Sequence, residues 1–196
     1  MNDNNEYTEA ENLPVDEKKS SLNELLEWLE AIAIAIMVVL LVFTFVLRQV
    51  MVVGNSMNPT LYDGERLIMT HLFYTPKQGD IVVANCVGEN KLNKSIIKRV
   101  IATEGQTIDI DFETGEVTVD GEVLEEDYIN ALTTTGDNQG YSYPLTVPEG
   151  CVFVMGDNRN HSTDSRYSVV GFINVEDISG KAVFRISPIG KFGFIE

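Results

Sequence analysis

The sequence predicts a mostly β domain preceded by one apolar helix. The first observation is that every residue from Ala31 to Leu47 is uncharged and almost all are apolar, which favours one continuous helix. The second is that short runs of apolar and β-branched residues follow Arg48, separated by glycine-containing turns, as is typical of antiparallel strands. At 196 residues, the chain is long enough for one ordinary domain with such a helix in front.

The apolar segment has the length and composition of a membrane span. At a rise of about 1.5 Å per residue, Ala31 to Leu47 covers about 25 Å, and extending it back to Trp28 brings it close to the hydrocarbon thickness. A buried core helix would show a polar stripe, but Thr44 is the only polar residue here. A cleaved secretory signal would end in small residues, whereas Leu47-Arg48-Gln49 follows. We therefore predict one transmembrane helix over residues 28–47.

The charges that flank this span predict its orientation. Lys18 and Lys19 precede it, Arg48 follows it closely, and positive charge tends to stay on the cytoplasmic side. We expect a single pass through the cell membrane, with the lipid bilayer as a partner. The acidic tail over residues 1–27 would then be cytoplasmic, and the domain over residues 48–196 would be extracytoplasmic.

Eight β-type runs are predicted in the domain, and tight turns separate several of them. Thr114-Gly115 and Asp120-Gly121 are typical of hairpin turns, because Gly and Asp tolerate positive φ. These turns and a polar loop lie between Gly105 and Gly150, so we predict a small inserted β subdomain over residues 105–150. The predicted strands are Val50–Val53, Arg66–Met69, Ile81–Ala84, Ile96–Ile101, Thr107–Phe112, Glu116–Val119, Cys151–Met155 and Ala182–Ile186.

The composition excludes several classes of function. The net charge is −16, from 30 acidic and 14 basic residues, and no cluster of Lys and Arg could bind a phosphate backbone, so we expect no nucleic-acid partner. Cys86 and Cys151 lie far apart in the sequence, without the spacing of metal ligands. We predict no metal and no cofactor. Two free thiols are expected, and an oxidising exterior would allow the alternative, a disulfide.

Ser56 and Lys98 are the candidate pair for chemistry. Lys98 shares a strand face with Ile96 and Val100, and apolar neighbours lower the pKa of a lysine toward that of a usable neutral base. Ser56 lies just before Asn58-Pro59, where a turn can present its hydroxyl to a base within hydrogen-bond reach. The alternatives are an exposed lysine on an edge strand and a turn serine that bonds its own backbone.

A third polar segment is unusually dense in hydrogen-bonding groups. It reads Gly156-Asp-Asn-Arg-Asn-His-Ser-Thr-Asp-Ser-Arg166. One interpretation is a loop that braces a site around the lysine. The alternative is a solvated loop in which Asp157 pairs with Arg159 and Asp164 with Arg166, each exposed pair contributing about 0–1 kcal/mol.

Four motifs of the chain resemble, in sequence and in their order, those of bacterial type I signal peptidases. The chain looks like a short member of the Gram-positive type. The resemblance runs from the apolar span to Gly180-Lys-Ala-Val-Phe-Arg185. It implies a signal-peptidase-like β catalytic domain with a small inserted β subdomain, behind one N-terminal transmembrane helix. The motifs are Val53-Gly-Asn-Ser-Met-Asn-Pro-Thr-Leu61, Gly79-Asp-Ile-Val-Val83, Ile97-Lys-Arg-Val-Ile101 and the segment from Gly156 to Arg166.

The resemblance also implies roles for single residues. Ser56 matches the nucleophile and Lys98 the general base of a Ser/Lys dyad. Some members carry a serine where this chain has Gly54, so the backbone amide of Ser56 would be the main oxyanion donor. The supporting residues that match are Ser162, which orients the lysine, Asp164, Arg166, and Asp157 paired with Arg99.

These observations lead us to expect a membrane-anchored serine endopeptidase that cleaves N-terminal signal peptides from secretory preproteins. The family's preference for small residues at −1 and −3 implies shallow apolar pockets, for which the candidates are Val52, Met57 and Ile97. One alternative is a non-catalytic, membrane-tethered β module that binds exported proteins. Another is a self-cleaving, repressor-type Ser/Lys peptidase, which would need a DNA-binding region.

Overall fold

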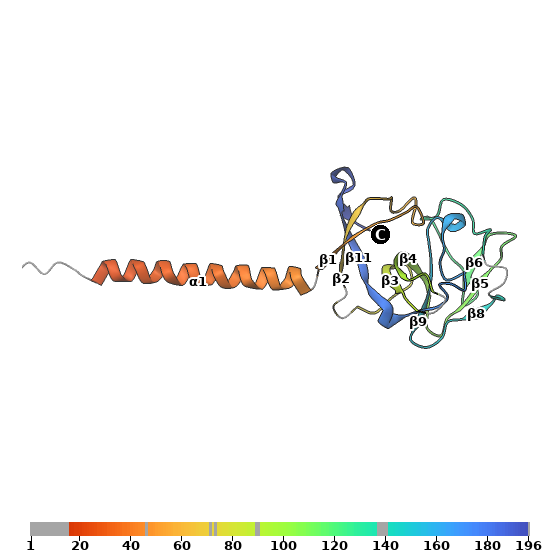
Figure 1. The fold of residues 1–196 in the computed structure, drawn as a ribbon, viewed down its shortest axis with the longest axis horizontal. Coiled ribbons are helices and arrows are strands. Elements are labelled where there is room, and N and C mark those ends of the chain that lie inside the picture. Colours follow the sequence, from red (N-terminus) through yellow and green to blue (C-terminus); the bar gives the residue numbers. More distant parts are fainter. Residues whose placement is uncertain are drawn as a thin grey trace, which may run out of the picture. The chain divides into compact units, whose positions relative to one another are not determined.

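The structure of the chain is a computed structural model that separates into two units, Met1–Phe43 and Thr44–Glu196, which we describe one at a time (Figure 1). It describes residues 16–45, 47–70, 72, 74–88, 91–136 and 141–195. Of the tail predicted over residues 1–27, residues 1–15 therefore lie outside the described residues.

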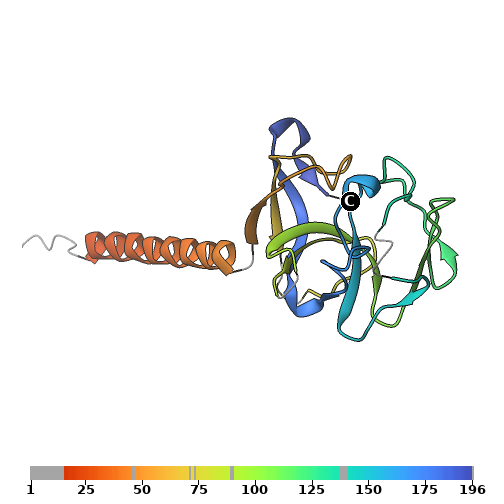
Figure 2. The same ribbon diagram turned by 45° about the vertical axis from the view of Figure 1, so that its right-hand side comes forward.

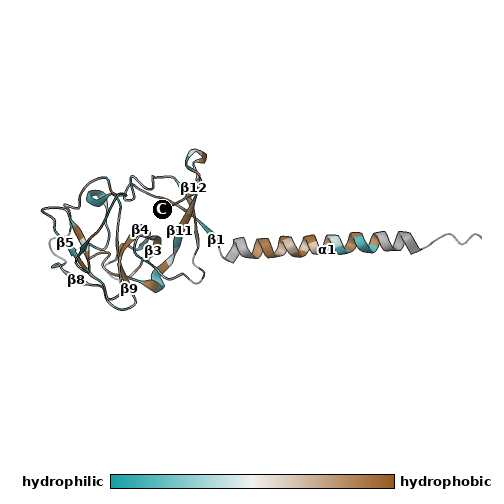
Figure 3. Ribbon diagram, turned by 180° about the vertical axis from the view of Figure 1, so that it is seen from behind, coloured by the Kyte–Doolittle hydropathy of each residue, from teal (hydrophilic) through white to brown (hydrophobic). Residues whose placement is uncertain are grey.

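A single long helix, α1 (Asp16–Phe45), dominates the first unit and begins inside the predicted tail. Glu, Lys and Leu are frequent in its first half, and all three are good helix formers, so the helix extends well before the apolar segment. Its colouring changes from hydrophilic to hydrophobic along the chain (Figure 3). Its apolar side chains, such as Ile34 and Leu40, are exposed. Within the described part of the chain, no helix is found that is both long and apolar enough to cross a membrane.

The second unit is built around an antiparallel sheet whose strand order is β1-β2-β11-β3-β4-β9-β10, with β12 paired to β11 (Figures 1 and 2). The last long strand, β11, therefore enters between β2 and β3, although the chain reaches it late. The strands are β1 (Leu47–Met51), β2 (Arg66–Thr70), β3 (Ile81–Cys86), β4 (Lys94–Thr103), β9 (Cys151–Met155), β10 (Ile173–Asn174), β11 (Ile178–Ser187) and β12 (Gly193–Phe194).

A second, smaller sheet has the strand order β7-β6-β5-β8 and falls within the predicted insertion, between β4 and β9. Asp120 and Gly121 connect β6 to β7 with φ of 54° and 84°, the two positive values that a two-residue hairpin of type I′ requires. The strands are β5 (Thr107–Ile110), β6 (Val117–Val119), β7 (Glu122–Val123) and β8 (Leu145–Thr146).

Three buried apolar clusters hold this unit together. One lies on β3, β4 and β9 and includes Val82 and Val154. Another joins the two sheets, because Phe153 of β9 packs with Ile108 of β5. The third includes Met57 and lies under the loop between β1 and β2. Short 3₁₀ helices, η1 (Arg159–His161), η2 (Val175–Asp177) and η3 (Ile189–Lys191), occur in the connections.

The mostly β prediction for this unit is confirmed, since each of the eight predicted runs overlaps an observed strand. The strands that the sequence did not reveal are β7, β8, β10 and β12. Each has only two residues, which is too short for an alternating pattern to be recognised.

Candidate active site

Lys98 lies in β4, near the middle of the large sheet, between β3 and β9. It pairs with Val82 of β3, and Arg99, the next residue, pairs with Met155 of β9. Only 3% of Lys98 is exposed. The alternative of an exposed lysine on an edge strand is therefore wrong.

Ser56 lies in the loop between β1 and β2, and backbone hydrogen bonds fix this loop. The Val52 N–H donates to the Glu65 carbonyl (2.8 Å), and Met57 is anchored in the apolar cluster below. Gly54 adopts a φ of +86°, which favours glycine, and its N–H donates to Asp63 Oδ1 at 2.7 Å. The loop thus presents the half-buried Ser56 hydroxyl toward β4.

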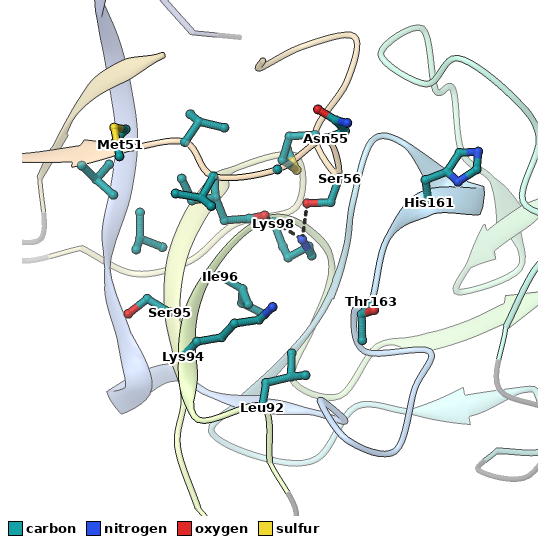
Figure 4. Close-up of a pocket in the computed structure, with 17 residues that line it drawn as sticks. Met51, Asn55, Ser56, Leu92, Lys94, Ser95, Ile96, Lys98, His161 and Thr163 are labelled. Carbon is teal, nitrogen blue, oxygen red and sulfur yellow. Dashed lines mark hydrogen bonds between the residues drawn. The ribbon is translucent and has the colours of Figure 1, made fainter. Parts of the chain in front are cut away.

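Ser56 and Lys98 meet at hydrogen-bond distance, with 2.6 Å between Oγ and Nζ (Figure 4). Lys98 Nζ also donates to the carbonyl oxygen of Ile97 at 3.1 Å. Burial lowers the pKa of Lys98 from its ordinary 10.5 to about 8. An amine with this pKa is neutral in a useful fraction of molecules near neutral pH, so it can accept a proton from the serine.

The Arg99–Asp157 pair ties the loop that follows β9 to β4 and to the serine loop. Arg99 Nε and Nη2 donate to the two oxygens of Asp157 at 2.9 and 2.8 Å, and both side chains are buried. The Thr60 hydroxyl, from the serine loop, donates to the same carboxylate at 2.5 Å. Asp157 therefore holds β4, the strand of Lys98, and the serine loop together.

Asp164 is the centre of a second buried network. Arg166 donates to both of its oxygens at 2.8 Å, and the Gly156 N–H and the Ser162 hydroxyl donate to Oδ2 at 2.9 and 2.6 Å. Burial alone would raise the pKa of Asp164, but the bonds from Arg166 hold it below its ordinary value. Ser162, expected to orient the lysine, thus donates its proton to Asp164, and no hydrogen bond between Ser162 and Lys98 is found among the described residues.

Gly156 and Asn158 are positioning residues that sequence reasoning did not single out. An added Cβ at Gly156 would lie 2.3 Å from Ser162 Oγ and 2.4 Å from the Ser56 carbonyl oxygen, so only glycine fits between them. The Asn158 N–H and its side-chain Nδ2 donate to the carbonyls of Ser56 and Asn55, both at 3.0 Å. The motifs around Ser56 and from Gly156 to Arg166 marked the two segments, but the sequence does not show that they meet or which of their groups touch.

Most of the segment from Gly156 to Arg166 is buried, so the alternative of a solvated loop is wrong, and of its two local ion pairs the structure forms Asp164–Arg166 but not Asp157–Arg159. Asp157 pairs with Arg99, whereas Arg159 is fully buried and forms an ion pair with Glu126 of the insertion. Arg159 Nη1 also donates to Thr133 Oγ1 at 2.9 Å. A ring from the insertion covers Arg99 as well, with 4.0 Å between the Tyr128 centroid and the guanidinium carbon.

A groove of about 420 Å³ opens beside the pair (Figure 4). The predicted pocket residues Val52, Met57 and Ile97 all line it; the first two are buried and Ile97 is half-buried. Lys94 and His161, which the sequence did not indicate, line it too. Among the described residues, no three His, Cys, Asp or Glu side chains are grouped as metal ligands, and the two cysteines are free thiols.

The chain is similar to known proteins of one family. The family described as "Signal peptidase, peptidase S26" matches residues 25–187. Signal peptidase I P of Bacillus subtilis subsp. natto is 38% identical over 188 residues, covering 90% of this chain and 96% of the relative. Probable signal peptidase I-1 of Synechocystis sp. is 38% identical over 169 residues, covering 82% of this chain and 81% of the relative.

Similarity extends to a solved structure and to a further relative. A signal peptidase I from Enterococcus faecalis V583 is 29% identical, with a TM-score of 0.43, covering 55% of this chain and 97% of that chain. Signal peptidase I of Bacillus licheniformis is 36% identical over 177 residues, 86% of this chain and 92% of the relative. The family match and the identities over most of both sequences place this chain in the peptidase S26 family, as a serine endopeptidase of the signal peptidase I type.

Proposed function

We propose that this chain is a membrane-anchored endopeptidase that removes signal peptides from secretory preproteins with Ser56 as nucleophile and Lys98 as general base. The family supports the cleavage of signal peptides. The dyad rests on one observation, the 2.6 Å between Ser56 Oγ and the buried Lys98 Nζ. A buried amine with a lowered pKa is what a lysine base requires.

The reaction follows from these positions. Neutral Lys98 takes the proton from Ser56 Oγ as the oxygen attacks the scissile carbonyl, and the resulting ammonium protonates the leaving amine. Lys98 then takes a proton from the water that attacks the acyl-enzyme, and returns it to Ser56 Oγ as the acyl group leaves as a carboxylic acid. Because the Gly54 N–H is already bonded to Asp63, the oxyanion would rest mainly on the backbone amide of Ser56.

The supporting roles are proposed from the two buried networks. Arg99 and Asp157 would keep the strand of the base in register with the serine loop. Asp164 and Arg166 would fix Ser162, whose oxygen can accept a hydrogen bond from Lys98 once the lysine is charged. A hydroxyl that donates to a carboxylate is left with acceptor capacity, which favours this role.

The substrate would bind with small side chains at −1 and −3. Val52, Met57 and Ile97 are proposed to line the pockets for these positions, because they give the groove an apolar lining close to the dyad. Shallow apolar pockets accommodate short substrate side chains and exclude long ones.

Anchoring is proposed through residues 28–47, with residues 1–27 cytoplasmic and residues 48–196, including the inserted subdomain 105–150, extracytoplasmic. Signal peptidases I are typically membrane-associated. The uncharged stretch from Ala31 to Leu47 supports this, as do the exposed apolar side chains of α1.

Ser56→Ala and Lys98→Ala test the dyad in the detergent-solubilised full chain. Each variant should abolish conversion of a preprotein to its mature form while circular dichroism shows an unchanged β domain. Ser142→Ala and Lys77→Ala, at exposed positions outside the groove, are matched controls that should cleave normally. Substantial cleavage by either dyad variant would refute the assignment. Binding of the preprotein without cleavage by the wild-type chain would instead support a non-catalytic module.

A further inference from the structure

The groove beside the dyad carries positive charge, although the protein as a whole is strongly acidic. The chain has 30 acidic and 14 basic residues. The ionisable side chains that line the groove are Lys94, Lys98 and His161, and none of its lining residues is Asp or Glu. Asp63 bonds the backbone of the lining residue Gly54 but does not itself line the groove.

Lys94 is the exposed charge of this groove. It lies in β4 four residues before Lys98, and side chains alternate along a strand, so both point to the same face. Figure 4 shows the Lys94 side chain extending from β4 into the pocket beside Ile96. No ion pair formed by the described residues includes Lys94. Its ammonium is therefore available to a bound peptide.

The charge of Lys94 is also close enough to act on the reacting groups. Burial is the main reason that the pKa of Lys98 is lowered, and the nearby Asp164 carboxylate opposes this effect. Lys94 adds to the lowering because two neighbouring ammonium groups repel each other. A charged substrate side chain that approaches Lys94 would thus lie near the scissile bond.

We propose that Lys94 is a specificity-determining residue that selects preproteins by the charge they carry near the scissile bond. This rests on the proposed function. An acidic substrate side chain that reaches Lys94 is attracted and a basic one repelled, and no carboxylate in the groove offsets the repulsion. A partly exposed ion pair changes kcat/KM by roughly threefold, so an acidic and a basic side chain should differ by about tenfold.

The test uses the detergent-solubilised full chain and a preprotein substituted with Asp, Asn or Lys at one position at a time, on either side of the scissile bond but not at −1 or −3. For at least one position, the wild-type kcat/KM should fall in the order Asp, Asn, Lys. Lys94→Glu should reverse this order, and Lys94→Gln should remove it. Each ratio is taken within one enzyme, so a change in basal rate cancels. The charge effect should shrink at high ionic strength.

Lys77→Glu is the matched control, because it changes the net charge equally at an exposed position outside the groove. It should keep the wild-type order. Equal cleavage of the Asp and Lys substrates by the wild type, or an unchanged order in Lys94→Glu, would overturn the role of Lys94. Failure of the wild type to cleave even the Asn substrates would instead overturn the proposed function.

Discussion

Replacing Lys98 with Met should stabilise the β domain, because it removes an amine that the fold holds in an unfavourable environment. A fall in pKa from 10.5 to about 8 means that protonated Lys98 destabilises the folded state by about 3 kcal/mol relative to the neutral amine. Met has a similar length and no charge. Losing the hydrogen bond with Ser56 subtracts about 1 kcal/mol, so the free energy of unfolding should rise by about 2 kcal/mol at neutral pH.

The pH dependence separates this effect from packing. Between about pH 8 and 10.5, the unfolded wild-type chain binds more protons at Lys98 than the folded one, so the wild type gains stability as pH rises. Below about pH 8 both states are protonated and the advantage of Lys98→Met is constant. Above it, the advantage should decrease by about 1.4 kcal/mol per pH unit.

Equilibrium urea unfolding of the two proteins, followed by circular dichroism, measures this difference. Tryptophan fluorescence would not report on the domain, because the single tryptophan, Trp28, lies in α1. The kcat/KM of the wild type for a preprotein should rise with pH and level off near the same value, about 8, since only the neutral amine acts as a base. A stability difference that does not change between about pH 8 and 10 would refute the reasoning.

Two further predictions concern the loop around the site. Gly156→Ala should lower kcat by about 100-fold, because the added methyl group would lie 2.4 Å from the Ser56 carbonyl oxygen and would push it aside. Single-turnover cleavage at saturating preprotein measures this effect, and an unchanged rate would contradict it. Glu126→Ala should lower the free energy of unfolding by about 3–5 kcal/mol, because it leaves the buried Arg159 unpaired. Lys181→Ala, which removes an ion pair between a half-buried lysine and Asp80, should lower it by about 1 kcal/mol or less in the same urea experiment. Equal effects would contradict this comparison.

Local patterns in the sequence predicted the strands and pointed to the chemistry. A run rich in Ile and Val identifies β4, and because side chains alternate in direction along a strand, Lys98 is expected to share a face with Ile96 and Val100. The motif around Ser56 indicates a turn that presents a hydroxyl. Both signals depend on a few adjacent residues, and a sequence displays such local features directly.

Contacts between distant segments could not be predicted in this way. Nothing near β11 indicates that it pairs between β2 and β3, because strand order depends on the whole sheet. The nearby Asp157 is the partner that the sequence offers Arg159, but Arg159 bonds Glu126, which is 33 residues away. Buried arginines take whichever carboxylate the fold brings to them, and charge spacing in the sequence does not reveal that choice.

The sheet order also predicts that the strands next to Ser56 and Lys98 open at different free energies. Lys98 lies on an interior strand, whereas the Ser56 loop leaves β1, which ends the strand order and, among the described strands, pairs only with β2. Edge strands open at lower free energies than interior ones, so amide hydrogens of β1 should exchange before those of β4. On heating, the enzyme should therefore lose turnover reversibly by fraying at this edge while most of the sheet is still intact.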